Sequence, residues 1–460
     1  MRSIATGKEF SRIAPLRARS RAPSRLSRAI VGIGLSKRLQ LLAERQALHR
    51  RVTDPAEIAR HQLAAFNGVW RIAVRRYRFY AEWQRRHGLK DQLADLAELQ
   101  HFPILRKADL EANFRTIAED AGPCGLIGTG GSSGPSTLFP RGPEDHAFLH
   151  SNMYLGRSWG GIAPGDNIVL IWGHDHLYGF GLKGSVNRVK RRVMDRLIGT
   201  KRLSVYRLDD DSVAAYFDAI RARPGAVVVG YVSAIRKLLD FVERSGIDGR
   251  DAGIRAVVFC SETVFARDLR RVRALLGAVP LIEYGMGETG VIAYSTPEAS
   301  ALTFLWDAFH CHASDAGELL VTSLQPFRFP LIHFGTGDRV QLLEGGDLLP
   351  FRCARIAGRT RTLLQLTLRD GRKIDVHSEL LEDCLDLVPE VRSYLIRQTG
   401  EKIEIAVRTV GDGSLEATRR HFLDVLGRHC GALDEATLRF TPLLREPYTV
   451  AGKRQYVVRD

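Results

Sequence analysis

Residues 128–137 combine small side chains with hydroxyl groups in a way that suits the binding of a polyanion. They read Gly-Thr-Gly-Gly-Ser-Ser-Gly-Pro-Ser-Thr, and five of the ten carry hydroxyls. Glycine lets a backbone approach a ligand closely and turn its N–H groups inward, and Ser and Thr add further donors. The segment therefore predicts a phosphate-binding loop, although a flexible surface loop has the same composition.

The spacing of these glycines excludes two familiar phosphate loops. A P-loop carries Lys directly after its second glycine, and no Lys follows the glycines here. A dinucleotide-binding loop has the pattern Gly-x-Gly-x-x-Gly. Counted from Gly128, its third glycine position is Ser133, and no strongly apolar strand precedes the segment. A nucleotide bound by this segment must be held in a different architecture.

Four further segments that combine glycine with charged residues lie downstream. In chain order they are 283–289 (Glu-Tyr-Gly-Met-Gly-Glu-Thr), 333–339 (His-Phe-Gly-Thr-Gly-Asp-Arg), 357–361 (Ala-Gly-Arg-Thr-Arg) and 452–454 (Gly-Lys-Arg). Each is weak alone, because Gly-Arg and Gly-Lys pairs are common. Their order and spacing together form a specific signal.

With the glycine-rich segment, this series resembles the adenylate-forming superfamily of acyl-CoA synthetases and adenylation domains. The branch it resembles most is the short one of phenylacetate–CoA ligase, coenzyme F390 synthetase and capsule-associated proteins. Residues 318–324 and 330–332 resemble that branch's approach to its Thr-Gly-Asp motif, and residues 261–263 (Ser-Glu-Thr) resemble its Gly-Glu-Pro segment. The resemblance covers roughly residues 95–460.

The resemblance implies an ATP-dependent ligase that activates a carboxylic acid. The carboxylate attacks the α-phosphorus of ATP to give an acyl-adenylate and pyrophosphate, so catalysis consists of positioning and charge neutralisation. The expected cofactors are ATP and Mg²⁺, and the expected substrate is a small carboxylic acid. The acyl group then passes to a thiol, with coenzyme A as the expected acceptor. An amine or a carrier-protein thiol stays open as the acceptor, and with no carrier domain appended, a carrier would act in trans.

The resemblance also assigns roles to particular residues. The β- and γ-phosphates are expected at Thr129, Gly130, Gly131, Ser132, Ser133 and Gly134. Adenine and ribose are expected at Glu283, Tyr284, Gly285, Asp338 and Arg359. The acyl pocket is expected to contain His176, Tyr178, Tyr231, Ser261 and Glu262. The catalytic residues are expected to be Lys453, which bridges the α-phosphate and the carboxylate, and Glu288, which binds Mg²⁺.

These residue types suit the expected chemistry, and each has a structural alternative. Mg²⁺ prefers oxygen ligands such as Glu288, whose alternative is a surface carboxylate. The two oxygens of Asp338 can accept both ribose hydroxyls, but an Asp here can also cap a turn. Arg359 and Lys453 can neutralise oxyanions or lie solvated at the surface. Tyr284 can stack on adenine or pack internally.

Three features depart from the family pattern. The glycine-rich segment lacks the family's usual Lys, and Gly287 stands where Thr or Ser usually precedes the Mg²⁺-binding glutamate. Arg361 replaces the usual acidic hinge residue, which bears on how a small domain swings between two half-reactions. A separate metal site at residues 174–176 (His-Asp-His) is disfavoured, because neighbouring residues of a turn rarely converge on one ion.

The elements that must position these residues alternate between strand and helix. After a helical region at about residues 39–87, apolar runs predict buried strands, and helical periodicity separates the later ones. The predicted strands are 167–173, 203–208, 226–231, 256–260 and 280–284, and the predicted helices between them are 211–223, 233–245 and 264–276. This alternation predicts an α/β layer with largely parallel strands, where ligands bind beyond the carboxyl ends of the strands.

The pattern changes after residue 358, where a hairpin signal at Asp370-Gly371 opens a compact α+β unit. We therefore expect a large N-terminal α/β domain with a mostly parallel sheet and a small C-terminal α+β lid domain. The predicted boundaries are a loose basic arm at 1–38, a large ATP- and substrate-binding domain at 39–358, and the lid at 359–460.

The composition is that of a globular protein with a basic excess. The 460 residues are 45% hydrophobic with a net charge of +15, and ten basic residues but one acid lie among the first 40. This arm keeps one other class open, a nucleic-acid or anionic-surface binder, although no nucleic-acid motif accompanies it and none is expected as a partner. Six scattered cysteines and the lack of a long apolar run predict a cytoplasmic protein without a membrane span. The oligomeric state is not indicated.

Overall fold

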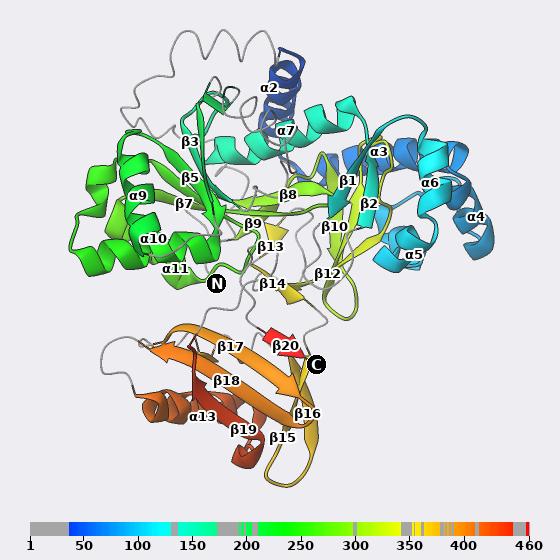
Figure 1. Cartoon of the computed structure of the whole chain (residues 1–460). Coiled ribbons are helices and arrows are strands. Elements are labelled where there is room, and N and C mark those ends of the chain that lie inside the picture. Colours follow the sequence, from blue (N-terminus) through cyan, green and yellow to red (C-terminus); the bar gives the residue numbers. More distant parts are fainter. Residues whose placement is uncertain are drawn as a thin grey trace. The chain divides into compact units, whose positions relative to one another are not determined.

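The computed structural model divides the chain into two compact units (Figure 1). The larger contains Met1–Thr336 and Val340–Ile356, and the smaller contains Gly337–Arg339 and Ala357–Asp460. The residues that the structure describes are 36–129, 137–172, 193, 195–196, 199–204, 210–297, 301–341, 352–353, 355–359, 363–377, 381, 384–385, 388, 391–409, 414–444 and 457–459.

Helices form the first part of the larger unit, as the periodicity predicts. They are α2 (Ser36–Arg51), α3 (Pro55–Arg76), α4 (Arg78–His87), η2 (Leu96–His101), α5 (Lys107–Ala112) and α6 (Phe114–Ala121). Asp54 separates α2 from α3 because its side chain accepts a hydrogen bond from the Glu57 N–H at 2.9 Å.

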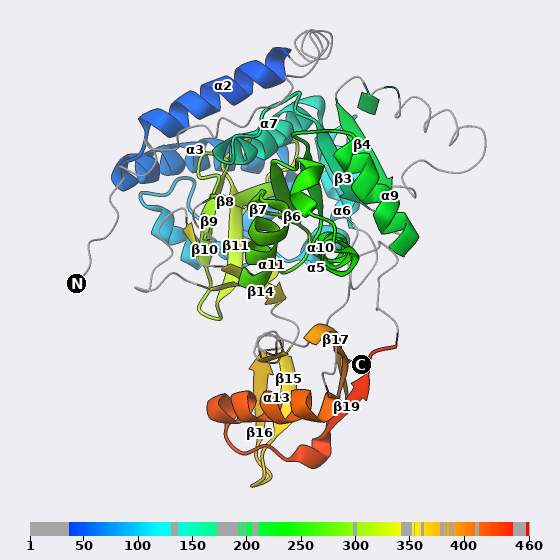
Figure 2. The same ribbon diagram turned by 90° about the vertical axis from the view of Figure 1, so that its left-hand side faces the viewer.

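Helix α2 has few apolar residues but is anchored by a buried ion network. The Arg45 guanidinium donates to both carboxylate oxygens of Asp307, at 2.6 and 2.9 Å, and also to Ser151 of α7 (Pro143–Trp159). His49 lies 2.8 Å from the same Asp307 carboxylate. Although burial raises the pKa of Asp307, Arg45 lowers it below its usual range. Figure 2 shows α2 alongside α7 and α3.

An eight-stranded sheet forms the centre of the larger unit. Its order is β13–β9–β8–β7–β6–β5–β3–β4, and the five strands from β7 to β4 run parallel, which confirms the predicted layer. The strands are β3 (Ile168–Trp172), β4 (Thr200–Ser204), β5 (Val227–Tyr231), β6 (Ala256–Cys260), β7 (Val279–Met286), β8 (Gly290–Ser295), β9 (Leu302–Phe304) and β13 (Arg352–Cys353). β8 and β9 extend the sheet in antiparallel fashion.

Helices cover both faces of this sheet, which explains why its central strands are apolar on both sides. Val227 and Val258 pack with Leu155 of α7 on one face. Val228 and Val257 pack on the other face, against α9 (Asp210–Arg221), α10 (Val232–Ser245), η4 (Gly249–Ala252), α11 (Ala266–Arg271) and the π-helical turn η5 (Val272–Leu276).

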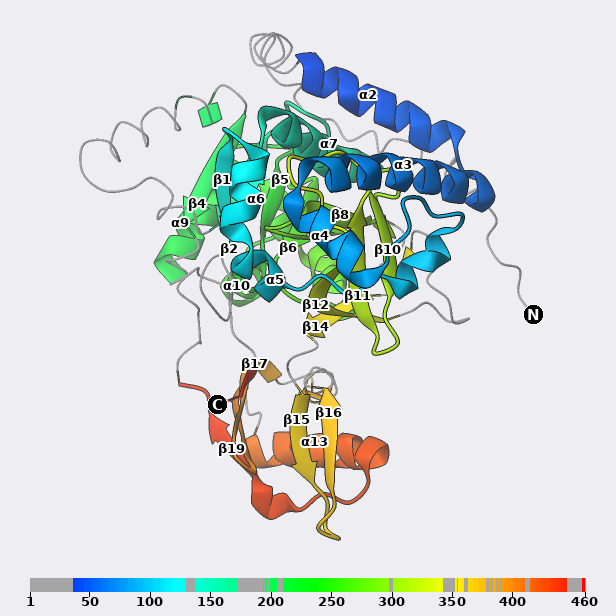
Figure 3. The ribbon, with the colours of Figure 1, turned by 90° about the vertical axis from the view of Figure 1, so that its right-hand side faces the viewer.

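Two smaller sheets accompany the central sheet. β1 (Gly125–Thr129) and β2 (Thr137–Arg141) form an antiparallel ribbon beside α6 (Figure 3), so a short strand does lead into the glycine-rich segment. β10 (Phe309–Ala313), β11 (Glu318–Ser323), β12 (Phe334–Gln341) and β14 (Arg355–Arg359) form a four-stranded sheet.

The smaller unit has its own sheet and core. β17 (Val391–Thr399), β18 (Lys402–Thr409), β19 (Leu438–Pro442) and β20 (Val457–Arg459) form a sheet of order β19–β18–β17–β20, with α13 (Leu415–Cys430) packed on it and η6 (Glu435–Thr437) preceding β19. β15 (Leu363–Thr367) and β16 (Lys373–His377) form the hairpin predicted at Asp370-Gly371, where Gly371 has φ 82°. The predicted fold class is confirmed.

None of the helices in the described part of the chain is long and apolar enough to cross a membrane.

Candidate functional site

The carboxyl ends of the parallel strands bring several predicted site residues to one edge of the sheet. Tyr231 ends β5 and pairs in register with Cys260 at the end of β6, and Cys260 pairs with Glu283 on β7. The segments after these strands, including Ser261 and the turn that carries Glu288, are therefore neighbours. This edge is where ligands bind in open α/β sheets.

Tyr231 is a packed aromatic residue at this edge. It is 3% exposed, and its ring centroid lies 4.5 Å from that of Trp172, the last residue of β3. The two rings line the interior between neighbouring strand ends. They form an apolar wall, which fits either a substrate pocket or a closed core.

The segment after β6 is strained and tied to a helix. Ser261 has φ 68°, a left-handed conformation that glycine adopts without cost, and this position matches the glycine of the family's Gly-Glu-Pro segment. Glu262 accepts hydrogen bonds from the Ser233 N–H at 2.6 Å and the Ser233 hydroxyl at 3.1 Å, in the first turn of α10. This carboxylate therefore caps α10, and a direct role in the acyl pocket stays a prediction.

The hairpin formed by β7 and β8 carries the motif at 283–289. Gly285 permits its tight turn, because a Cβ there would lie 2.4 Å from the Gly290 carbonyl oxygen. Tyr284 is partly buried and packs on the apolar core. Glu283 points to groups within the protein: its Oε2 lies 3.1 Å from Arg157 Nη2 and accepts a short hydrogen bond from the Tyr294 hydroxyl. The side chain predicted to contact the nucleotide is thus engaged inside the unit, and contact through its backbone stays a prediction.

Glu288 lies in the turn between β7 and β8, where it is 7% exposed. Its carboxylate forms an ion pair with Lys107 Nζ at 2.9 Å, and its carbonyl oxygen accepts a short hydrogen bond from Arg141. Two cations therefore surround the predicted metal ligand.

Sequence reasoning missed Lys107 and Arg141 as members of this site. Lys107 begins α5 and Arg141 ends β2, so both lie far from Glu288 along the chain. The scarcity of lysine in an Arg-rich chain was a signal for Lys107. Nothing in its sequence context distinguishes Arg141 from other arginines.

Several predicted residues lie partly or wholly outside the described part of the chain. Thr129 is described by its backbone, which pairs with Thr137 across the β1–β2 ribbon and so holds the two ends of the glycine-rich segment together. Asp338 lies partly buried on β12, and Arg359 ends β14 with its side chain not described. Outside the described residues lie Gly130, Gly131, Ser132, Ser133, Gly134, His176, Tyr178 and Lys453.

A stack of three histidines, one buried and two partly buried, includes the residue that leads into the Thr-Gly-Asp motif. His333, with φ 51°, stacks on His312 with the two Nε2 atoms 3.2 Å apart, and His312 lies beside His310. Burial, with a smaller effect of the neighbouring histidines, lowers the pKa of His310 to about 4 and that of His312 to about 3. These rings are therefore neutral. Within the described residues, no group of three or more His, Cys, Asp or Glu side chains could hold a metal ion.

Comparison with known proteins finds similarity to acyl-CoA ligases, in agreement with the resemblance that the motifs indicate. The chain is 25% identical over 415 residues to phenylacetate-coenzyme A ligase of Pseudomonas putida, a match that covers 84% of this chain and 87% of the ligase. This resemblance lies in the branch predicted from the motifs. No protein-family model matches the chain.

Solved structures confirm the fold over both units. 2-Hydroxyisobutyryl-CoA ligase in the postadenylation state, in complex with R3-HIB-AMP, has a TM-score of 0.67 and 17% identity, and the match covers 88% of this chain and 90% of that one. An open conformation of that ligase, in complex with 2-HIB-AMP and CoA, has a TM-score of 0.56 and 17% identity, with 88% and 92% covered.

Proposed function

We propose that this protein is an ATP-dependent ligase that activates a small carboxylic acid as an acyl-adenylate and transfers the acyl group to coenzyme A. The observation that carries this proposal is the Tyr284–Glu288 turn at the carboxyl edge of the parallel sheet, in a chain that resembles phenylacetate-coenzyme A ligase over most of its length. The same resemblance and the motif order support it as an AMP-forming acid–thiol ligase. The fold and composition suit a cytoplasmic enzyme.

In the first half-reaction, the carboxylate oxygen attacks the α-phosphorus and pyrophosphate leaves. The backbone N–H groups and hydroxyls of the glycine-rich segment hold the β- and γ-phosphates. Asp338 accepts the ribose hydroxyls, Arg359 supports them, and Lys453 neutralises the α-phosphate and the incoming carboxylate together. The turn at Tyr284 and Gly285 lies beside adenine. In the second half-reaction, the thiol sulfur attacks the acyl carbon and AMP leaves.

The residues around Glu288 fit a magnesium ion that arrives with the nucleotide. Mg²⁺ is commonly held by one or two carboxylates together with substrate phosphates and water, so one buried glutamate in a turn suffices. Bound there, the ion would neutralise phosphate charge. Lys107 Nζ lies 2.9 Å from the Glu288 carboxylate, and this ammonium must yield part of its contact when another cation binds the carboxylate.

The acceptor is proposed to be coenzyme A because similar proteins use or bind coenzyme A. The P. putida relative is by name a coenzyme A ligase, and the 2-hydroxyisobutyryl-CoA ligase structure is in complex with CoA. The apolar pair of Trp172 and Tyr231 at the strand ends supports an acid with an apolar or aromatic side chain.

The proposal is tested by pyrophosphate exchange across a panel of carboxylic acids, followed by acyl-CoA formation. We expect exchange with at least one acid, and a fall of about 100-fold or more in the Lys453→Ala variant. Lys402→Ala is the matched control, because Lys402 is an exposed lysine of the same unit. No exchange with any acid contradicts the function, while equal exchange by Lys453→Ala contradicts only the lysine assignment.

A further inference from the structure

Two buried arginines flank helix α7 in closely similar surroundings. Arg141 lies just before the helix and Arg157 in its last turn, and they are 3% and 5% exposed. The Arg141 guanidinium lies 5.4 Å from the ring centroid of Phe327, and that of Arg157 lies 5.6 Å from the ring of Tyr154. Neither Nε atom has a hydrogen-bond partner among the described residues. Burial of a guanidinium is unfavourable, so each arginine needs a hydrogen-bond or charged partner that compensates for its lost hydration.

Each arginine has a partner on the β7–β8 hairpin, and the Asp145 carboxylate also acts on Arg141 electrostatically. Arg141 donates to the carbonyl oxygen of Glu288 in the turn, and Arg157 pairs with the Glu283 carboxylate on β7 at 3.1 Å. Tyr294, opposite Glu283 on β8, donates to the same carboxylate oxygen. The hairpin is therefore bound to the end of β2 at its turn and to α7 at its base.

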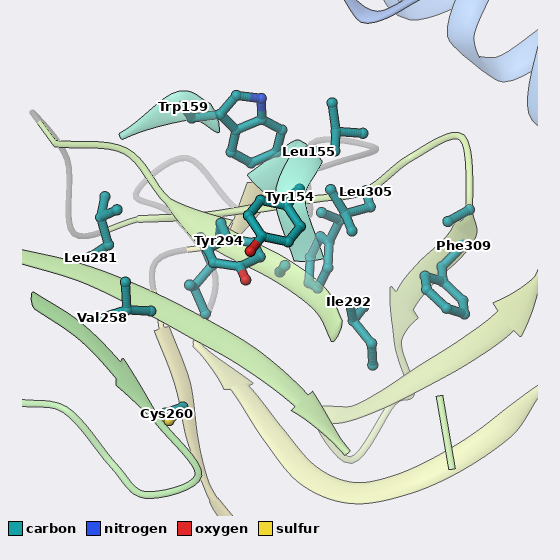
Figure 4. Close-up of a cluster of buried hydrophobic side chains, with 14 of the residues drawn as sticks. Tyr154, Leu155, Trp159, Val258, Cys260, Leu281, Ile292, Tyr294, Leu305 and Phe309 are labelled. Carbon is teal, nitrogen blue, oxygen red and sulfur yellow. The ribbon is translucent and has the colours of Figure 1, made fainter. Parts of the chain in front are cut away.

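Between these two points, α7 lies directly against the hairpin. Asn152 donates to the Val291 carbonyl oxygen at 3.3 Å. A Cβ on Gly156 would lie 1.8 Å from the ring of Tyr294, so no side chain fits there. Figure 4 shows Tyr154 of α7 beside Tyr294 of β8.

We propose that Arg141 and Arg157 are positioning residues for the nucleotide, acting through the β7–β8 hairpin. Successive residues of a strand point to opposite faces, so fixing Glu283 toward α7 leaves Tyr284 on the other face. The hydrogen bond from Arg141 to the Glu288 carbonyl oxygen sets the orientation of the turn, and with it the position of the Glu288 carboxylate. Because α7 follows directly from β2, the contacts of Arg141 and Arg157 tie the hairpin to the end of β2 and to the last turn of α7. This inference rests on the proposed function and adds residues that touch neither substrate nor metal.

The test compares ligand-free hydrogen exchange in residues 283–291 and MgATP affinity among matched variants. The hairpin variants are Arg141→Met, Tyr294→Phe, and Arg157→Met combined with Glu283→Met, which removes both charges together. The control is Arg236→Met combined with Asp268→Met. That pair is also buried, with 2.7 Å between Arg236 Nη2 and Asp268 Oδ2 and the guanidinium 5.3 Å from the Phe265 ring, but it lies away from the hairpin.

We expect faster exchange in the hairpin and a Kd for MgATP raised about ten- to a hundredfold in the hairpin variants, as displacement of about 1 Å can cause. The control should keep wild-type affinity at a comparable loss of melting temperature. Hairpin variants that lose thermal stability but bind MgATP as tightly as wild type would overturn the proposal.

Two further results keep the test decisive. If the charge-removing variants do not fold, the Tyr294→Phe variant, which removes one hydrogen bond and no charge, tests the positioning role. Its readouts are again hydrogen exchange in the hairpin and MgATP affinity. If wild-type protein does not bind MgATP, the proposed function fails, and the positioning role falls with it. If wild-type protein binds MgATP and the hairpin variants bind it equally tightly, the positioning role is wrong and the proposed function stands. A partial recovery of affinity in Arg157→Lys, relative to Arg157→Met, is expected because the lysine keeps the charge but not the planar geometry.

Discussion

Each end of the β7–β8 hairpin carries a glutamate, and the two glutamates have different kinds of cationic partner. At the base, Glu283 is held by Arg157, whose side chain is 7% exposed, and by the buried Tyr294. At the turn, Glu288 is held by Lys107, whose side chain is 30% exposed. A fixed guanidinium in the interior cannot withdraw, but an ammonium on a flexible, partly solvated stem can. The partner, more than the motif, thus separates a structural carboxylate from one available to a ligand.

The largest expected effect comes from removing the fixed partner. Arg157→Met leaves Glu283 buried without a counter-charge, so we expect a loss of about 3–5 kcal/mol in the free energy of unfolding. Urea unfolding measures it, and the double variant with Glu283→Met should recover most of the loss. A loss below about 1 kcal/mol would show that Glu283 finds solvent and that the two ends do not differ.

Removing the exchangeable partner should cost less and should depend on magnesium. Lys107→Met leaves Glu288 with the Arg141 contact to its carbonyl, and because Lys107 is partly solvated we expect a loss of about 1–2 kcal/mol. Added Mg²⁺ should restore part of this stability by binding the freed carboxylate. Thermal melts with Mg²⁺ or with EDTA measure it. An identical effect of Mg²⁺ on the melting temperature of wild type and variant would contradict the replacement of Lys107 by Mg²⁺ at Glu288.

The histidine stack extends the comparison to titratable groups whose pKa is lowered mainly by burial. The pKa of His310 is about 4 and that of His312 about 3 when folded, below the usual 6.5. The unfolded chain therefore binds more protons between about pH 4 and 6.5, and stability must fall as pH drops through this window.

We expect a loss of about 2 kcal/mol per histidine between pH 7.5 and pH 5, measured by urea unfolding at both values. His312→Gln should remove its share of the pH dependence. A variant with the wild-type pH profile would mean that His312 is protonated in the folded state.

The smallest effect is expected at Ser261, which follows the residue paired with Glu283 on the neighbouring strand and where strain replaces charge pairing. Ser261→Gly relieves the left-handed backbone and should stabilise the protein by about 0.5–1 kcal/mol. Ser261→Val should destabilise it, since a β-branched residue is least compatible with positive φ. Calorimetry distinguishes the two, and stabilisation by valine would show that the backbone is relaxed.

The fold followed from the sequence more completely than the site did. Alternating apolar runs predicted β3, β5, β6 and β7 because burial on both faces leaves an unbroken apolar pattern. The predicted strand at 280–284 placed Tyr284 on β7, and the motif placed Glu288 after this strand.

The pairings within the site had no such signal. Lys107 and Arg141 reach Glu288 from distant parts of the chain, and Arg157 meets Glu283 across 126 positions. Sequence records the type of a charged residue but not its counter-ion, which the packing of α7 on the hairpin decides. The sequence therefore predicted ligand contacts for both, with Mg²⁺ for Glu288 and adenine or ribose for Glu283.

The contact between Gly156 and Tyr294 has a consequence for how this enzyme can diverge. Any side chain on the helix would occupy the space of the aromatic ring. The two positions can therefore change only together, with a larger residue at 156 requiring a smaller one at 294. Homologues that retain this glycine–tyrosine pair should share the same helix-to-hairpin spacing, and lineages that lost it should show compensating substitutions at both sites.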